Sequence, residues 1–129
     1  MRKLMLFVVL VFFAAGCAAQ PQLVDNGKPG RISAVIFFDQ NKNGVQDAGE
    51  PGAAGTIGLS QDVSCPAANL GKVSKKEADA QGGVFFENLK PGHYCVSYFG
   101  DKGLTTKQNR ELDLSSEQTV QVFFGLSEK

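Results

Sequence analysis

The chain has 129 residues, which suits one domain and is short for two. It carries 13 basic and 13 acidic side chains, so its formal net charge is zero, and this balance argues against nucleic acid as a partner. With 15 glycines, 10 phenylalanines, no tryptophan and turn residues scattered throughout, the composition is typical of an all-β domain of many short strands.

The N-terminus has the layout of a signal peptide. Two basic residues, Arg2 and Lys3, precede an unbroken apolar run over residues 4–15. The run is too short to cross a bilayer as a helix, because a transmembrane helix needs about 20 residues. We therefore expect residues 1–16 to be removed, which leaves 11 basic against 13 acidic side chains, a net charge of about −2.

The residues before the first cysteine, Ala14-Ala15-Gly16-Cys17, resemble the lipobox of bacterial lipoproteins. The resemblance implies that a diacylglyceryl group is attached to Cys17 and that cleavage occurs before it. The mature chain would then be exported and held in the cell envelope by a lipid, at the outer membrane if the organism has one or otherwise at the cell surface. The alternative is an ordinary secretory signal cut near Ala19.

Residues 17–30 form the next segment, which is polar and contains two prolines and two glycines but no apolar periodicity. This composition predicts a flexible tether after the lipidated cysteine. Residues 31–129 are then the folded domain.

Seven or so short segments of the domain are β-branched or aromatic and are bounded by turn residues, which predicts strands. In residues 93–99, Tyr94 and Val96 alternate with Cys95 and Ser97, so we expect the first pair to face a core and the second pair to face solvent. This number of strands with short turns predicts a β-sandwich. The expected strands are residues 31–38, 56–63, 70–76, 83–88 and 93–99, one or two within 104–114, and 118–124.

Two cysteines remain once Cys17 is set aside. Cys65 and Cys95 form an even pair in an exported chain, which predicts a disulfide between them. Two free thiols are the alternative. A metal site at the cysteines would need more soft ligands than two cysteines and one histidine supply.

The loop over residues 39–50 matches the calcium-loop pattern D-x-[DN]-x-[DN]-G-x5-E at every specified position. Calcium takes six to eight oxygen ligands, and short oxygen-bearing side chains at alternating positions can turn inward together around it. Gly44 would permit the sharp bend in the middle. The expected ligands are the side chains of Asp39, Asn41 and Asn43, the carbonyl of Val45, Asp47 directly or through water, and both oxygens of Glu50.

The segments beside this loop separate it from an EF-hand, which needs a helix on each side. Residues 32–38 are strand-like, and Pro51-Gly52 follows Glu50 directly. A solvated loop of the Asn-Gly kind, with no ion, is the alternative interpretation.

The loop and a later motif together resemble the SdrD B-like domain, the B-type repeat of serine-aspartate-repeat surface proteins. The resemblance covers residues 32–96 and implies a prealbumin-like or Cna-B-like β-sandwich that binds Ca²⁺. It also implies that an acidic residue of the second motif, here Asp79, adds to the coordination. The matching residues are Asp39, Asn41, Asn43-Gly44, Asp47 and Gly49-Glu50-Pro51-Gly52, then Gly83-Val84-Phe85-Phe86, Leu89, Pro91-Gly92, Tyr94 and Val96.

The chain also departs from the family pattern. After the position of Gly55, family members have apolar residues at odd offsets, whereas Ile57 and Leu59 of this chain lie at even offsets. The second strand is therefore expected to shift or bulge. The first strand contains no internal lysine, so we expect none of the Lys-Asn isopeptide crosslinks that related domains carry. The domain is present once rather than in a tandem array.

These features predict a non-catalytic, calcium-stabilised structural or interaction domain of a cell-envelope lipoprotein. The expected partners are the membrane, through the lipid on Cys17, and an envelope or extracellular protein; no nucleic acid is expected. A ligand-binding surface adhesion module is one alternative. A small envelope enzyme is another, although the single histidine, His93, follows a turn and is expected to be a surface residue.

Overall fold

The computed structural model describes residues 23–61, 65 and 73–127. The predicted signal peptide at residues 1–16, the lipid-acceptor Cys17 and residues 18–22 of the tether lie outside these ranges. Every regular element in the described ranges is a strand, and none of their residues form a helix long and apolar enough to cross a membrane. The strands are β1 (Gly30–Phe38), β2 (Thr56–Gln61), β3 (Ser74–Glu77), β4 (Gly83–Leu89), β5 (Gly92–Phe99), β6 (Asn109–Leu114) and β7 (Thr119–Leu126).

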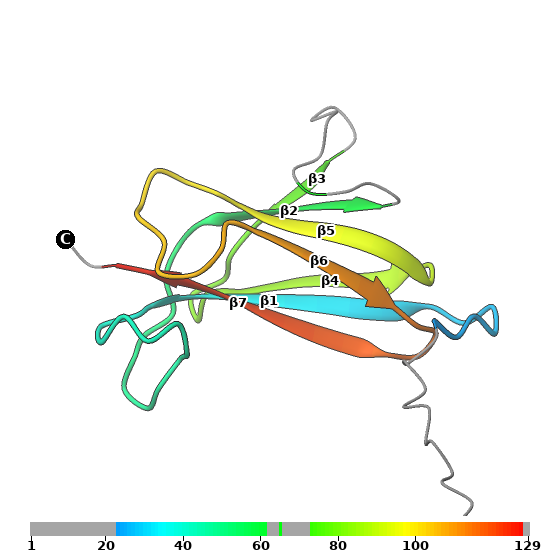
Figure 1. Ribbon diagram of the computed structural model, residues 1–129, viewed down its shortest axis with the longest axis horizontal. Coiled ribbons are helices and arrows are strands. Elements are labelled where there is room, and N and C mark those ends of the chain that lie inside the picture. The colour runs from blue at the N-terminus through cyan, green and yellow to red at the C-terminus, as the bar shows by residue number, and fades with distance from the viewer. Residues whose placement is uncertain (1–22, 62–64, 66–72, 128–129) are drawn as a thin grey trace, which may run out of the picture.

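The strands form two sheets that pack face to face (Figure 1). One sheet has the order β4-β1-β7, with β1 antiparallel to β4 and parallel to β7. The other has the order β3-β2-β5-β6 and is antiparallel throughout. The predicted all-β sandwich of about seven strands is confirmed.

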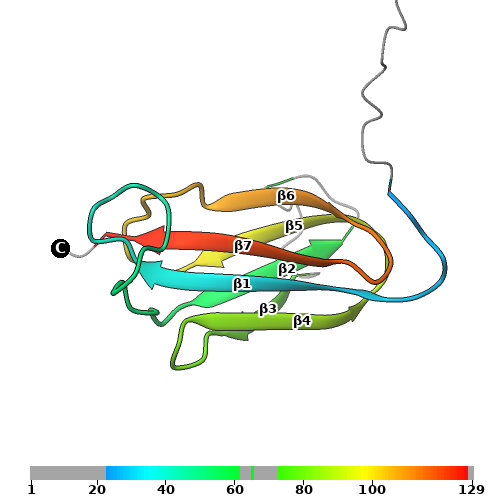
Figure 2. The same cartoon turned by 90° about the horizontal axis from the view of Figure 1, so that it is seen from below.

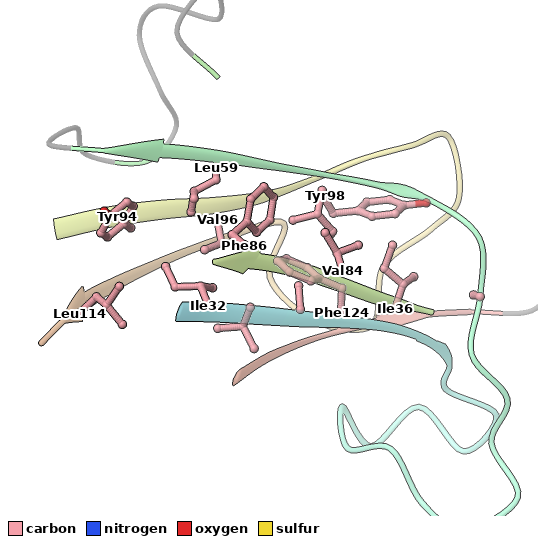
Figure 3. Packing of buried hydrophobic residues seen from close by; sticks show 14 of the residues in the cluster. Ile32, Ile36, Leu59, Val84, Phe86, Tyr94, Val96, Tyr98, Leu114 and Phe124 are labelled. Carbon is pink, nitrogen blue, oxygen red and sulfur yellow. The ribbon is translucent and has the colours of Figure 1, made fainter. Parts of the chain in front are cut away.

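The core lies between the sheets because alternate residues of every strand except β3 are apolar. In β1, Ile32, Ala34 and Ile36 have no exposed surface. Ile32 and Ile36 face Val96 and Tyr98 of β5 across the sandwich (Figure 3). Burying one such large apolar side chain contributes about 1.5–3 kcal/mol to stability. The two faces therefore hold the sheets together, as the alternation predicts.

The outer face of β5 differs from the prediction. Tyr94 and Val96 face the core as expected, but Cys95 and Ser97 are also buried, with 1% and 7% of their surface exposed. Cys95 is covered by its disulfide to Cys65, and the Ser97 hydroxyl donates to Asn109 Oδ1 over 2.7 Å. Period-two alternation predicts which face a side chain takes, and it does not predict what lies over that face.

The predicted disulfide is confirmed, and it joins Cys65 to the centre of the four-stranded sheet. The two Cα atoms lie 5.5 Å apart, within the range that a disulfide requires. A crosslink that closes a loop of this length stabilises a fold by about 3–4 kcal/mol in the chain-entropy account.

The second strand is regular, so the expected shift or bulge in it is wrong. Thr56 to Gln61 pair one for one with Phe99 to Tyr94 of β5. The register shift that the structure does contain lies between Gly30 and Ile32, where β1 meets β4. Gly58 of β2 is closely packed, because a Cβ at this position would lie 2.4 Å from the Phe99 ring and 2.6 Å from Val73. A larger residue there would require the Phe99 and Val73 side chains to shift.

The described part of the predicted tether is bonded to the domain. Val24 N donates to Ser115 Oγ and Asn26 N donates to Ser116 Oγ, both over 3.0 Å. The Lys28 ammonium lies 3.3 Å from Glu117 Oε1. Residues 24–28 therefore lie against the β6–β7 turn, and the folded unit begins before residue 31.

Candidate metal centre

The loop over residues 39–50 leaves the end of β1 and is closed at its base by the chain that follows it (Figure 1). Phe38 N donates to Pro51 O over 2.9 Å, and Ala53 N donates to Ile36 O over 2.8 Å. The backbone of residues 51–53 thus continues the pairing of β1, so the two ends of the loop are fixed a short distance apart.

Asp39 begins the loop with a carboxylate that is almost fully buried, with 1% of the residue exposed. Its Oδ1 accepts a hydrogen bond from Asn43 N over 3.1 Å, and its Oδ2 accepts one from Gly44 N over 2.8 Å. Oδ2 also accepts the Thr105 hydroxyl over 2.5 Å. Burial by itself raises the pKa of Asp39, but these hydrogen bonds outweigh it and hold the pKa below the usual value, so the carboxylate is charged.

Glu50 ends the loop and is buried as well, with 8% exposed. Its Oε1 accepts a hydrogen bond from Gln40 N over 2.9 Å and its Oε2 accepts one from Asp47 N over 2.8 Å. One carboxylate therefore joins the start of the loop to its far side.

Three further predicted ligands converge between these ends. The side-chain amides of Asn41 and Asn43 both donate to Asp47 Oδ2 over 2.7 Å. Asn43 Oδ1, the side-chain amide oxygen, accepts a hydrogen bond from Val45 N over 2.9 Å, which is a local turn that coils the backbone. The structure therefore brings Asn41, Asn43 and Asp47 together.

Gly44 makes the predicted bend. Its φ is +77°, in the left-handed region where a side chain is disfavoured, and Lys42, two residues earlier, has a φ of +56°. The Val45 side chain points away from the protein and is 59% exposed. Its carbonyl oxygen accepts no hydrogen bond from the described residues, so it is free to bind a ligand.

The chemistry of the loop fits a hard cation. Asp39, Asp47 and Glu50 have no ion pair with a lysine or arginine among the residues that the structure describes. A carboxylate offers about four acceptor positions, and in all three residues some of these remain unused. Calcium takes such oxygens as ligands.

The loop is not arranged as a finished cage. In residues 23–61, 65 and 73–127, no three or more acidic, cysteine or histidine side chains are grouped in positions that could hold a metal ion. Backbone N–H groups and the two asparagine amides occupy some of the carboxylate acceptor positions. The residues fit calcium by type and by capacity, and calcium binding stays a prediction.

Asp79 lies in the turn between β3 and β4 and is exposed. Its Oδ1 accepts hydrogen bonds from Gln81 N over 2.9 Å and from Gly83 N over 2.8 Å. These bonds serve its own turn, and no described contact joins its carboxylate to the loop of residues 39–50. Its proposed part in coordination is therefore also still a prediction.

Thr105 contributes to this site and was not found by sequence analysis. It lies between β5 and β6, and its N–H donates to Gly125 O over 2.9 Å while its hydroxyl reaches Asp39. A lone threonine 66 residues from Asp39 belongs to no spacing pattern. Only the packing of the β5–β6 loop against the end of β7 brings the two together.

His93 lies on β5 and is held by two acidic neighbours on β6. Its Nδ1 lies 2.8 Å from Asp113 Oδ1 and its Nε2 lies 3.9 Å from Glu111 Oε1. The side chain is 40% exposed, in agreement with the predicted surface position. Cys65 and Cys95 are joined to each other, so neither offers a thiol.

Solved structures with a similar fold include several pilin proteins. The minor pilin GBS52 of Streptococcus agalactiae superposes with a TM-score of 0.55 at 14% identity, over 79% of this chain and 45% of that one. The major pilin subunit BcpA of Bacillus cereus gives a TM-score of 0.56 at 16% identity, over 78% and 30%. The major pilin SpaD of Corynebacterium diphtheriae gives 0.55 at 14%, over 84% and 34%. The chain thus has the Cna-B-like β-sandwich fold of these domains.

The profile of the SdrD B-like domain matches residues 30–122, so the chain belongs to the SdrD B-like domain family. A curated relative is the serine-aspartate repeat-containing protein F of Staphylococcus epidermidis, which is 33% identical over 67 residues. The match spans 52% of this chain and 4% of that protein, so this chain corresponds to a small part of the relative.

Proposed function

We propose that the chain is a calcium-stabilised, non-catalytic structural or interaction domain of an exported cell-envelope lipoprotein. One observation carries the calcium proposal. The buried carboxylates of Asp39 and Glu50 close the two ends of one loop, and no described lysine or arginine pairs with either. Two buried negative charges with a third at Asp47 repel each other, and a divalent cation would remove the repulsion.

The role of the ion in this proposal is to stabilise the fold. An ion that binds only the folded state adds a free energy of RT ln(1 + [L]/Kd) to stability. Extracellular calcium modules bind with a Kd of about 10⁻⁴–10⁻³ M. In calcium at about ten to a hundred times the Kd, the gain would be about 1.4–2.7 kcal/mol.

A structural role is also supported by the cysteine and histidine side chains, the groups that an enzyme would most often use as nucleophile or base. The two described cysteines form a disulfide, and the His93 ring is held by acidic side chains on the outer face of β6. The names of the relatives, pilin subunits and a serine-aspartate repeat protein, support a place on the cell surface with another surface protein as partner.

A thermal melt tests the calcium proposal. The chain without residues 1–16, and with Cys17→Ser so that it carries no lipid, is unfolded in millimolar Ca²⁺, in Mg²⁺ and in chelator. We expect a rise of several degrees in Ca²⁺ alone, and no rise in Glu50→Gln, whose amide cannot supply the charge. Glu77→Gln makes the same change at an exposed carboxylate on β3, outside the proposed site, and should keep the full rise in Ca²⁺. Equal melting temperatures in Ca²⁺ and chelator, with no heat on titration, would refute the proposal.

The lipid anchor has its own test. Full-length chain in a bacterial host should incorporate labelled palmitate and fractionate with membranes, and Cys17→Ala should lose both properties. Secretion of unlabelled wild-type chain cut near Ala19 would show an ordinary signal peptide instead.

A further inference from the structure

Strand β7 has a bare edge in its first half. Among the described residues it pairs only with β1, and the β5–β6 loop covers its other edge only near the end. There Thr105 N donates to Gly125 O and Ser127 N donates to Gly103 O, both over 2.9 Å. The N–H and C=O of one strand residue point to the same edge, and successive residues alternate. Thr119, Gln121 and Phe123 therefore present their backbone groups at the uncovered edge.

The other edges of the two sheets are protected by charge. The edge strand β3 has three charged side chains among four residues, and the edge strand β6 has three among six. On β4, the Lys76 ammonium donates to Phe85 O over 2.9 Å and so occupies an edge carbonyl. Charged side chains at an edge discourage pairing with another chain. Strand β7, with the sequence TVQVFFGL, has none.

The core is incompletely covered on the same side. The sheet of β7 has three strands and the opposite sheet has four, and Figure 2 shows β6 lying beyond β7 on this side. Leu112 of β6 and Val120 of β7 pack against the core but are only partly buried. A further strand beside β7 would cover both side chains, and burial of apolar area stabilises such a pairing by about 25 cal/mol per Å².

We propose that this edge is the interface for a second copy of the chain, in which the two β7 strands pair antiparallel around a twofold axis at Gln121. In this arrangement Gln121 faces its own copy, and Thr119 faces Phe123 of the partner subunit. Both are pairs in which the residues exchange backbone N–H···O=C bonds, because all three residues direct those groups to the free edge. The two sheets then become one continuous sheet.

The chemistry of β7 favours its own copy as the partner. A twofold interface brings each side chain near its equivalent, so charges of one sign would repel, and β7 carries no charge. Paired Gln121 amides can each donate and accept. Thr119 opposite an aromatic side chain is a favourable cross-strand pair, and on the core side Val120 comes opposite Val122 of the partner subunit. This argument does not depend on calcium.

Sedimentation equilibrium of the chain without residues 1–16, carrying Cys17→Ser, tests the proposal over a wide range of concentration. We expect a reversible monomer–dimer equilibrium in both Ca²⁺ and chelator. Gln121→Lys should weaken the dimer about tenfold or more, because it places two like charges opposite each other. Ser74→Lys adds the same charge at an exposed position on β3 and should leave the dimer unchanged.

Both substituted residues are exposed, so each variant should keep the wild-type circular dichroism and melting temperature. A wild-type chain that stays monomeric at every concentration would overturn the proposal. So would a Gln121→Lys dimer as strong as the wild type, or an equal loss in Ser74→Lys.

Discussion

Thr105 and Asp39 are 66 residues apart in the chain and are joined by a 2.5 Å hydrogen bond from Thr105 Oγ1 to Asp39 Oδ2. Asp39 N also donates to Leu126 O over 2.8 Å. The first residue of the candidate calcium loop is therefore attached both to the β5–β6 loop and to the end of β7. Any change in the loop on ion binding would act on these segments directly.

Loss of the Thr105 hydroxyl should weaken the ion site. Thr105→Val keeps the shape of the side chain but leaves the Asp39 carboxylate with one hydrogen bond fewer, so its orientation becomes less defined and its pKa rises. We expect weaker Ca²⁺ binding in calorimetric titration and a lower melting temperature in chelator. Thr105→Ser retains the hydroxyl and should behave as the wild type. Equal affinity in Thr105→Val would show that the bond does not position Asp39.

Stability should fall in acid through Asp39. Hydrogen bonds in the folded state lower its pKa below 3.8, the ordinary value that applies in the unfolded chain. A carboxylate with a lowered folded-state pKa adds stability that is fully present above the unfolded pKa and is lost as pH falls through the folded one. Urea unfolding in chelator should show this loss below about pH 4. Asp39→Asn should flatten the acid side of the curve, and an unchanged slope would contradict the assignment.

Replacement of Gly44 should lower the affinity for Ca²⁺ in addition to straining the backbone. Gly44 and Gly27 both have positive φ, +77° and +82°, and added Cβ atoms would meet no close neighbour at either. Alanine at each should therefore cost a similar strain of about 1–2 kcal/mol. Of the two variants, only Gly44→Ala should lower the Ca²⁺ affinity, because Gly44 lies in the loop and Gly27 does not. Parallel titrations of both variants distinguish this from a general loss of stability.

Removal of the disulfide should destabilise the domain without removing the ion site. Cys65→Ser, or reduction of the wild type, should lower the free energy of unfolding in urea by about 3–4 kcal/mol. The described contacts of Cys65 are the disulfide to β5 and a hydrogen bond from its N–H to Glu111 Oε1 of β6 over 2.6 Å, and none of them joins it to residues 39–50. The rise in melting temperature with Ca²⁺ should therefore persist. Its disappearance in Cys65→Ser would indicate that the loop depends on the crosslink.

Much of the fold followed from local patterns. β1, β4 and β5 have β-branched and aromatic runs bounded by glycine or proline, and the structure places strands within two residues of the predicted bounds. One or two strands were expected within residues 104–114, and the structure has one there, β6; Leu104 makes only an isolated bridge to Leu126, and the residues after it turn toward Asp39 and Gly125. Polar segments such as this one carry little periodicity, so tertiary contacts decide their structure.

The sequence by itself determined the all-β class, the Cys65–Cys95 pairing and the oxygen-rich loop from Asp39 to Glu50. Each of these features depends on residue types at short spacing or on the number of cysteines, and both can be read from the sequence without knowledge of the tertiary structure. Only the tertiary structure decided that Cys95 and Ser97 are buried, that Thr105 reaches Asp39 and that β7 has a free uncharged edge. These facts depend on which strands become neighbours, and strand order is set by packing between residues far apart in the chain.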